Sequence, residues 1–300
     1  MPTKQNLLPV GGLLSGALVW GMIWYPYRAL EAAGMEGPLA TLLTYTFALL
    51  AGGFMLPRVW RELPSAGGWA ILLILSAGWA NFGYVLAMLE GEVMRVLLLF
   101  YLAPLWTILF ARWLLAERLN AYGYAVIALS LCGAAVMLWQ PASGLPLPHV
   151  WAEWIGLTAG MGFALSNVVS RRAAHLSLEM KSFSVWAGTL LLTLPLLLWQ
   201  GKGWPQFAAI GSASWGLLAL LGLTICATSY AVQYGVARVQ ANRAILLLLS
   251  ELVVAALSSW WLAGEAMDSR EWLGAFLIIS ASLLSGRLYP ETRRNQGEIR

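Results

Sequence analysis

Ten apolar segments, each about 20 residues long, follow one another along this 300-residue chain and are separated by short links that carry charge, Gly or Pro. About 20 apolar residues in an α-helix cross the hydrocarbon core of a bilayer. The segments lie at about 9–29, 38–57, 67–89, 95–115, 121–140, 151–171, 181–200, 212–236, 242–263 and 271–288. This pattern predicts an all-α polytopic membrane protein with ten transmembrane helices.

The composition excludes several other classes of protein. Hydrophobic residues make up 60% of the chain and charged residues 11%, whereas soluble domains carry roughly a quarter charged residues. The apolar segments are too continuous for barrel strands, which alternate over about ten residues. The chain has one Asp, Asp268, and two His, His149 and His175, so an aspartate dyad is impossible and a His-rich metal site is not expected. We therefore predict no enzyme activity, no cofactor and no metal.

The distribution of Lys and Arg predicts the orientation in the membrane. With the N-terminus in the cytoplasm, the cytoplasmic side carries 14 of the 18 basic residues, and the other side keeps Arg28, Arg95, Lys202 and Arg270. Cytoplasmic loops are enriched in Lys and Arg. We therefore expect a multi-pass protein of the bacterial inner membrane with both termini in the cytoplasm. The net charge of +4 is attributed to these loops and not to binding of nucleic acid.

Comparison of the chain with itself reveals an internal repeat. The matched pairs are Gly12 with Gly156, Gly16 with Gly160 and Arg28 with Arg172 at an offset of 144, and Arg95 with Arg243, Trp113 with Trp261 and Glu117 with Glu265 at an offset of 148. Because each copy has an odd number of helices, the second copy enters the membrane from the opposite side, as in transporters with alternating access. We expect a first five-helix repeat at 1–140, a linker at 141–150 and a second repeat at 151–300 that ends in a cytoplasmic tail.

Two glycine pairs recur at equivalent places in the two repeats. Gly12 and Gly16 stand four residues apart in the first segment, and Gly156 and Gly160 do so in the sixth. Such pairs let helix backbones approach closely. The pattern predicts tight packing of the first and sixth helices near the pseudo-symmetry axis.

The end of the first repeat resembles a known family. The runs Tyr101–Trp106 and Leu114–Leu119 resemble the end of a repeat in the drug/metabolite transporter superfamily, and Glu265–Gly274 resembles its second copy, with Glu251 or Leu252 where the Pro is missing. The resemblance implies two inverted five-helix repeats around a central cavity. It also implies a cavity wall built by the first, third, fourth, sixth, eighth and ninth helices. Within the superfamily, the chain is most similar to the aromatic amino acid exporters.

A transport path needs polar and aromatic groups within an apolar wall. The candidates for substrate binding, all away from segment ends, are Trp20, Trp24, Asn81, Tyr84, Tyr101, Ser166, Asn167, Thr228, Gln233, Tyr234 and Glu251. Ser166 and Thr228 have a structural alternative, since such hydroxyls often bond the carbonyl of residue i−4. Asn81 and Gln233 are stronger candidates because a buried amide needs partners. Pro104 is expected to kink the fourth helix and redirect Tyr101 toward the cavity, or to accommodate packing.

Glu251 stands out because it lies near the middle of an apolar segment. A carboxylate at the bilayer centre costs several kcal/mol, so it must face protein or water. It can carry protons, bind the ammonium of a substrate or belong to a hydrogen-bond network. We favour the substrate or network role, because one carboxylate without a nearby His or Asp makes a poor proton relay.

The candidates are rich in rings and amides and poor in charge, which suits a ligand with a flat apolar body and a small polar head. The sequence therefore predicts a monomeric exporter of aromatic or hydrophobic amino acids whose partners are this substrate and the lipid bilayer. The alternative within transport is a multidrug exporter of aromatic cations, with Glu251 as the counter-ion. A membrane enzyme or a receptor-like binding protein is the third class, but no catalytic constellation supports an enzyme.

Overall fold

The structure is a computed structural model that describes residues 7–116, 121–139, 147–200, 207, 210–236, 238–239 and 241–285. All regular elements within these residues are helices. They are α1 (Leu7–Met22), α2 (Trp24–Ala32), α3 (Gly37–Ala51), η2 (Gly52–Met55), α4 (Leu56–Glu90), α5 (Val93–Phe100), α6 (Ala103–Leu114), α7 (Ala121–Leu138), α8 (Trp151–Arg172), α9 (Leu178–Gln200), α11 (Ser212–Val236), α12 (Ala241–Ser258), η3 (Ser259–Ala263) and α13 (Ser269–Ser285).

Six helical stretches within the described residues are long and apolar enough to cross a membrane. They are Leu7–Ala32, Gly37–Glu90, Val93–Leu114, Ala121–Leu138, Leu178–Trp199 and Ser212–Val232. The second has 54 residues, more than twice the length of one crossing, and it bends at Gly67, whose φ of 58° suits glycine. The part of the chain that the structure describes is thus all-helical and typical of a membrane protein, and the arrangement of ten crossings in inverted repeats stays a prediction.

The helix that contains Pro104 is broken in two. α5 ends at Phe100 and α6 begins at Ala103, with Pro104 in the first turn of α6. Proline is tolerated at this place, because the first N–H groups of a helix have no partner within the helix. The break leaves Tyr101 outside regular helix, between the two parts.

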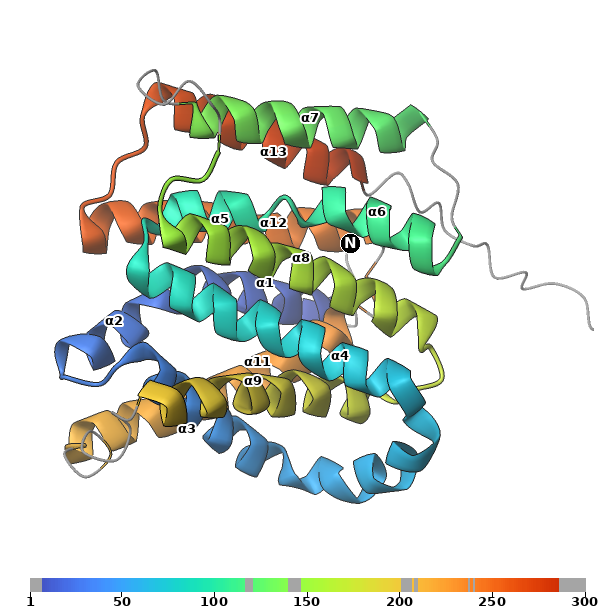
Figure 1. The fold of residues 1–300 in the computed structure, drawn as a ribbon, viewed down its shortest axis with the longest axis vertical. Coiled ribbons are helices and arrows are strands. Elements are labelled where there is room, and N and C mark those ends of the chain that lie inside the picture. Colours follow the sequence, from blue (N-terminus) through green and yellow to red (C-terminus); the bar gives the residue numbers. More distant parts are fainter. Residues whose placement is uncertain are drawn as a thin grey trace, which may run out of the picture.

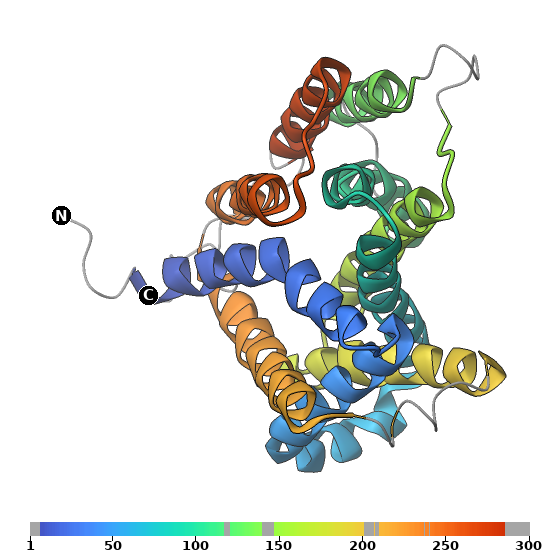
Figure 2. The same ribbon diagram turned by 90° about the vertical axis from the view of Figure 1, so that its left-hand side faces the viewer.

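The helices form a ring, which Figure 2 shows along their axes. α1 packs against α11 and α12, while α8 packs against α4, α5 and α6. α3 contacts both α11 and α9, and α9 contacts α4. The contact of α5 with α12 completes the ring. α7 and α13 pack against each other at one edge, at the top of Figure 1.

The repeated glycines allow close approach, but not between the two helices that carry them. A Cβ atom at Gly12 would overlap the carbonyl oxygen of Ala231 in α11, and one at Gly160 would overlap the backbone of Phe100 in α5. The prediction that the first and sixth helices pack on each other is therefore corrected. α1 and α8 each use their glycines to pack against a neighbouring helix from the other half of the chain.

The ring has two ends, named here after one arginine at each. At the Arg28 end, Arg28 in α2 donates to the carbonyl oxygen of Gly91 in the turn between α4 and α5. At the Arg58 end, Arg58 near the start of α4 pairs with Glu179 at the start of α9. In Figure 1, α2 lies at the left and the bend of α4 at the right.

Candidate functional site

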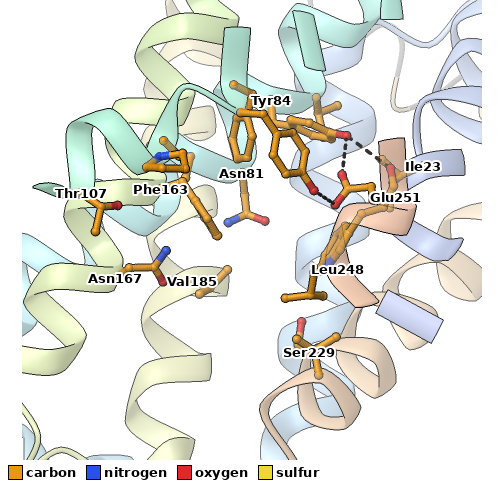
Figure 3. Close-up of a pocket in the computed structure, with 18 of the residues that line it drawn as sticks. Ile23, Asn81, Tyr84, Thr107, Phe163, Asn167, Val185, Ser229, Leu248 and Glu251 are labelled. Atoms are coloured by element: carbon orange, nitrogen blue, oxygen red, sulfur yellow. Dashed lines mark hydrogen bonds between the residues drawn. The ribbon is translucent and has the colours of Figure 1, made fainter. Parts of the chain in front are cut away.

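A cavity of about 450 Å³ lies inside the ring and is shown in Figure 3. Its wall is largely apolar and aromatic, with rings from Trp20, Phe100, Phe163 and Trp186. The volume falls in the range of about 300–1,000 Å³ that is typical of small-molecule sites. The described residues thus enclose a space of the size and character that a small apolar ligand needs.

Glu251 of α12 is the charged residue of this wall among the described residues. Its side chain accepts two hydrogen bonds, from the Tyr101 hydroxyl to Oε2 at 2.9 Å and from the Tyr84 hydroxyl to Oε1 at 3.3 Å (Figure 3). The Tyr84 hydroxyl lies equally far, 3.3 Å, from the carbonyl oxygen of Trp20. Because a hydroxyl has a single proton, Tyr84 satisfies only one of these acceptors at a time. The carboxylate therefore retains capacity for a further donor.

Packed rings hold the two tyrosines in place. The ring of Phe100 lies 5.1 Å from that of Tyr84 and 6.2 Å from that of Tyr101, edge to face in both cases. The ring of Phe163 of α8 also packs against that of Phe100, at 5.3 Å. Edge-to-face pairs at these separations are favourable. The break after α5 thus places Phe100 where its ring packs against both tyrosine rings, and Tyr101 where its hydroxyl bonds Glu251.

Two amides provide neutral polar groups. Asn81 of α4 accepts a hydrogen bond from the Tyr45 hydroxyl at 2.9 Å and donates one to the carbonyl oxygen of Ala77 at 2.9 Å. Each of these bonds uses only part of the capacity of the amide. Figure 3 shows Asn167 and Thr107 across the cavity from Glu251. The wall therefore offers a carboxylate on one side and neutral polar groups on the other.

The structure brings six of the eleven predicted residues to the cavity wall, although their roles in binding stay predictions. These six are Trp20, Asn81, Tyr84, Tyr101, Asn167 and Glu251. Gln233 lies in α11, but its side chain is outside the described part of the structure.

Four predicted residues lie away from this wall. Trp24 is 2% exposed and donates from Nε1 to Ser258 Oγ. Ser166 donates to the carbonyl oxygen of Phe163, which matches the structural alternative for membrane serines. Thr228 is buried outside the wall, and the ring of Tyr234 lies 3.7 Å from the Arg238 guanidinium.

Sequence reasoning did not select several residues of the wall. Tyr45 in α3, Thr107 in α6 and both Ser182 and Trp186 in α9 line the cavity. α3 and α9 correspond to the second and seventh predicted segments, which the family resemblance left out of the wall. Tyr45 and Trp186 are aromatic residues with a polar group inside apolar segments, and this signal would have found them. Within the described residues, no group of three or more His, Cys, Asp or Glu side chains is placed to hold a metal.

Comparison with known proteins gives consistent matches. Residues 150–287 match the sequence pattern of the EamA-like transporter family. An uncharacterized transporter of Archaeoglobus fulgidus is 26% identical over 82% of this chain and 87% of its own length. A probable terminal-alkyne amino-acid exporter of Streptantibioticus cattleyicolor is 28% identical over 85% of this chain and 84% of its own length.

The fold also occurs in a solved structure. A crystal structure of another protein, 22% identical in sequence, superimposes with a TM-score of 0.54 over 95% of this chain and 96% of the other. At this identity the likeness concerns the fold alone. It supports the arrangement of the helices and leaves the substrate to be argued from the site.

Proposed function

We propose, from the match of residues 150–287 to the EamA-like transporter family, that this protein is a transporter that exports aromatic or hydrophobic amino acids and related small metabolites across the bacterial inner membrane. The family and the relatives are those of transporters and not of enzymes. The observation that carries the substrate proposal is the aromatic cavity with one carboxylate, Glu251.

The architecture that we propose is ten crossings in two inverted five-helix repeats, 1–140 and 151–300, joined by the linker 141–150. In the proposed repeat, α8 corresponds to α1, α4 to α11, and α5 with α6 to α12. The contacts of α1 with α11 and α12 then correspond to those of α8 with α4, α5 and α6, which supports the repeat. α8 also begins at the Arg28 end, where α2 ends, as an inverted copy requires. Because one chain surrounds the cavity, the transporter is proposed to act as a monomer.

The Arg58 end is proposed to face the cytoplasm, because the side with more Lys and Arg is the cytoplasmic one. Wall residues lie close to this end. Asn167 is five residues from the end of α8, and Ser182 is four residues from the start of α9, distances of about 6–8 Å along a helix. The cavity is therefore placed to load substrate from the cytoplasm.

The chemistry of the wall supports a ligand with a ring and an amino group. A substrate ammonium can bond the carboxylate of Glu251 as a third donor beside the two tyrosine hydroxyls, and charge-assisted hydrogen bonds of this kind are the strong ones. An aromatic body then packs among Trp20, Phe100 and Phe163.

One observation favours a second candidate, an exporter of aromatic cations. Among the described residues, the wall contains no Lys, Arg or His. The carboxylate of an amino acid would meet only neutral donors such as those of Asn167 and Thr107. An aromatic amine without a carboxylate would leave the bound site electrically neutral.

Transport into proteoliposomes tests both candidates. We expect labelled tryptophan and phenylalanine to move faster than glutamate and lysine, since the wall has little charge to solvate a charged side chain. Tryptamine, which lacks the carboxylate, separates the two candidates: faster transport of tryptamine than of tryptophan supports the aromatic-cation exporter. Equal rates for lysine and phenylalanine would contradict the amino acid proposal.

Cysteine labelling tests the orientation. In a chain with Cys132→Ala and Cys226→Ala, exposed positions at the two ends are replaced, Ala33→Cys and Ser65→Cys. A membrane-impermeant maleimide should label Ala33→Cys in intact cells and Ser65→Cys only after permeabilisation. The reverse result would overturn the orientation.

A further inference from the structure

At the Arg28 end, three ion pairs join the first half of the chain to the second. Arg28 Nη1 lies 3.1 Å from Glu265 Oε1. Arg95 lies between two carboxylates, with Nε 2.9 Å from Glu153 Oε1 and Nη1 3.6 Å from Glu271 Oε1. Both arginines belong to the first half and all three carboxylates to the second. Each pair therefore breaks if the halves separate at this end.

The pair of Arg28 and Glu265 is the centre of a larger cluster. Arg28 Nη2 donates to the carbonyl oxygens of Met88 at 3.2 Å and Gly91 at 2.8 Å. Glu265 Oε2 accepts a hydrogen bond from the backbone N–H of Val93 at 2.8 Å. One ion pair thus connects α2, the turn between α4 and α5, and the segment that follows η3.

This cluster lies directly beyond the cavity. Ile23 is the last wall residue before Arg28, and Val85 is the last wall residue in α4. Arg28 is five residues beyond Ile23 and Met88 is three residues beyond Val85, which corresponds to about 5–8 Å along a helix. The ion pairs close the ring within two helical turns of the wall.

One arm of the molecule carries both Glu251 and Glu265. Glu251 lies in the wall, and η3 leads from α12 to Glu265. Between them, Ser258 accepts a hydrogen bond from Trp24 Nε1 at 3.2 Å and donates to the carbonyl oxygen of Gly21 at 3.2 Å. These two bonds tie the arm to the part of the chain that carries Arg28, so movement of Glu265 away from Arg28 must break them together with the ion pair.

We propose that the pairs of Arg28 with Glu265 and of Arg95 with Glu153 and Glu271 form the gate at the exit of the transport path. They separate when the arm that carries Glu251 moves with its substrate. This inference rests on the proposed function, since it requires the Arg28 end to face the periplasm. Charged groups suit a gate of this kind, because water solvates guanidinium and carboxylate once they part, whereas an apolar seal would expose hydrophobic surface.

Access to the cavity from outside the cell tests the gate. Ser229 of α11 lines the cavity (Figure 3). In a chain with Cys132→Ala and Cys226→Ala, it is replaced, Ser229→Cys, and a membrane-impermeant maleimide is added to intact cells. Glu265→Gln keeps the shape of the side chain and removes the ion pair. We expect it to raise the labelling rate at this position by about fivefold or more, as for coupled two-state elements. The matched control Glu179→Gln removes an ion pair at the opposite end and should not raise this rate.

A second measurement holds the gate closed. In the same cysteine-free background, Arg28→Cys and Glu265→Cys are joined by a short, cleavable bifunctional thiol reagent. Export should stop after cross-linking and resume when the linker is cleaved. Export at the original rate through cross-linked protein would overturn the gate, and so would unchanged labelling in the folded Glu265→Gln variant.

The results of these gate experiments can be interpreted whether or not the proposed substrate is correct. Labelling of Ser229→Cys needs no substrate, so an increased rate supports the gate even if no amino acid is transported. Conversely, aromatic amino acid export together with unchanged labelling leaves the proposed function in place and overturns the gate alone. For the cross-linking test, export is measured with whichever compound the proteoliposome panel identifies.

Discussion

Glu251 and Glu265 lie on the same arm of the molecule, yet the two carboxylates have opposite surroundings. Glu251 accepts hydrogen bonds from the neutral hydroxyls of Tyr84 and Tyr101. Glu265 is paired with the guanidinium of Arg28. A buried carboxylate retains its charge most readily with a cation beside it. Glu265 has that cation within the chain, whereas Glu251 is proposed to receive one from a ligand.

The ion pairs at the two ends of the ring differ in burial. The side chains of Arg95 and Glu153 are 18% and 6% exposed, while those of Arg58 and Glu179 are 62% and 24% exposed. Exposed pairs contribute little to stability, but loss of one partner from a buried pair leaves an uncompensated charge. Removal of one partner is therefore expected to cost more folding free energy at the Arg28 end than at the Arg58 end.

The largest effect is expected from Arg95→Gln. This change leaves Glu153 and Glu271 without the guanidinium that lies between them, at a cost of about 3 kcal/mol of folding free energy, the scale for breaking a buried ion pair. Thermal unfolding in detergent measures the loss. Arg270→Gln is the matched control, because Arg270 is an exposed arginine at the same end. Equal unfolding temperatures for the two variants would contradict the stabilising role of the buried ion pairs of Arg95.

Glu251→Gln should weaken binding of an aromatic amine or amino acid by about thirtyfold, corresponding to about 2 kcal/mol for truncating a buried charge pair. Glu31→Gln, an exposed carboxylate, serves as the control. Transport is measured with and without an imposed pH gradient. A fall in affinity in both conditions supports a role for Glu251 in binding the ammonium. Loss of only the gradient-driven component would instead assign proton transfer to Glu251.

Tyr101→Phe should weaken transport about fivefold, because it removes one hydrogen bond to the carboxylate and keeps the ring, a change of about 1 kcal/mol. The control is Tyr124→Phe, whose hydroxyl-bearing side chain is 63% exposed on α7. Initial rates in proteoliposomes, set beside the unfolding temperature, separate binding from folding. A large fall in unfolding temperature would show that Tyr101 acts in packing.

The smallest effect is expected from Arg58→Gln. Because this pair is largely exposed and screened by solvent, its loss should change stability by less than about 0.5 kcal/mol. The unfolding temperature, measured beside that of Arg95→Gln, sharpens the comparison between the two ends. A loss as large as that of Arg95→Gln would show that exposure does not determine the strength of these pairs.

Much of the local structure follows from the sequence. Hydropathy and segment length indicated helices at the apolar segments, and Pro104 indicated a kink at the place where the structure has a break between α5 and α6. Glu251 was recognisable because a carboxylate in an apolar segment is costly unless it has partners. Such inferences need only the chemistry of one helix and its solvent.

The partners across the ring were decided by tertiary structure alone. Tyr84 and Tyr101 come from different helices and meet at Glu251, and Arg28 reaches Glu265 across 237 positions of sequence. The glycine pairs indicated close packing, but the contacts of α1 with α11 and of α8 with α5 came only from the assembled ring. Helical periodicity identifies the face on which a side chain lies. Which neighbour that face meets depends on how all the helices pack together, because each of them has apolar surface to offer.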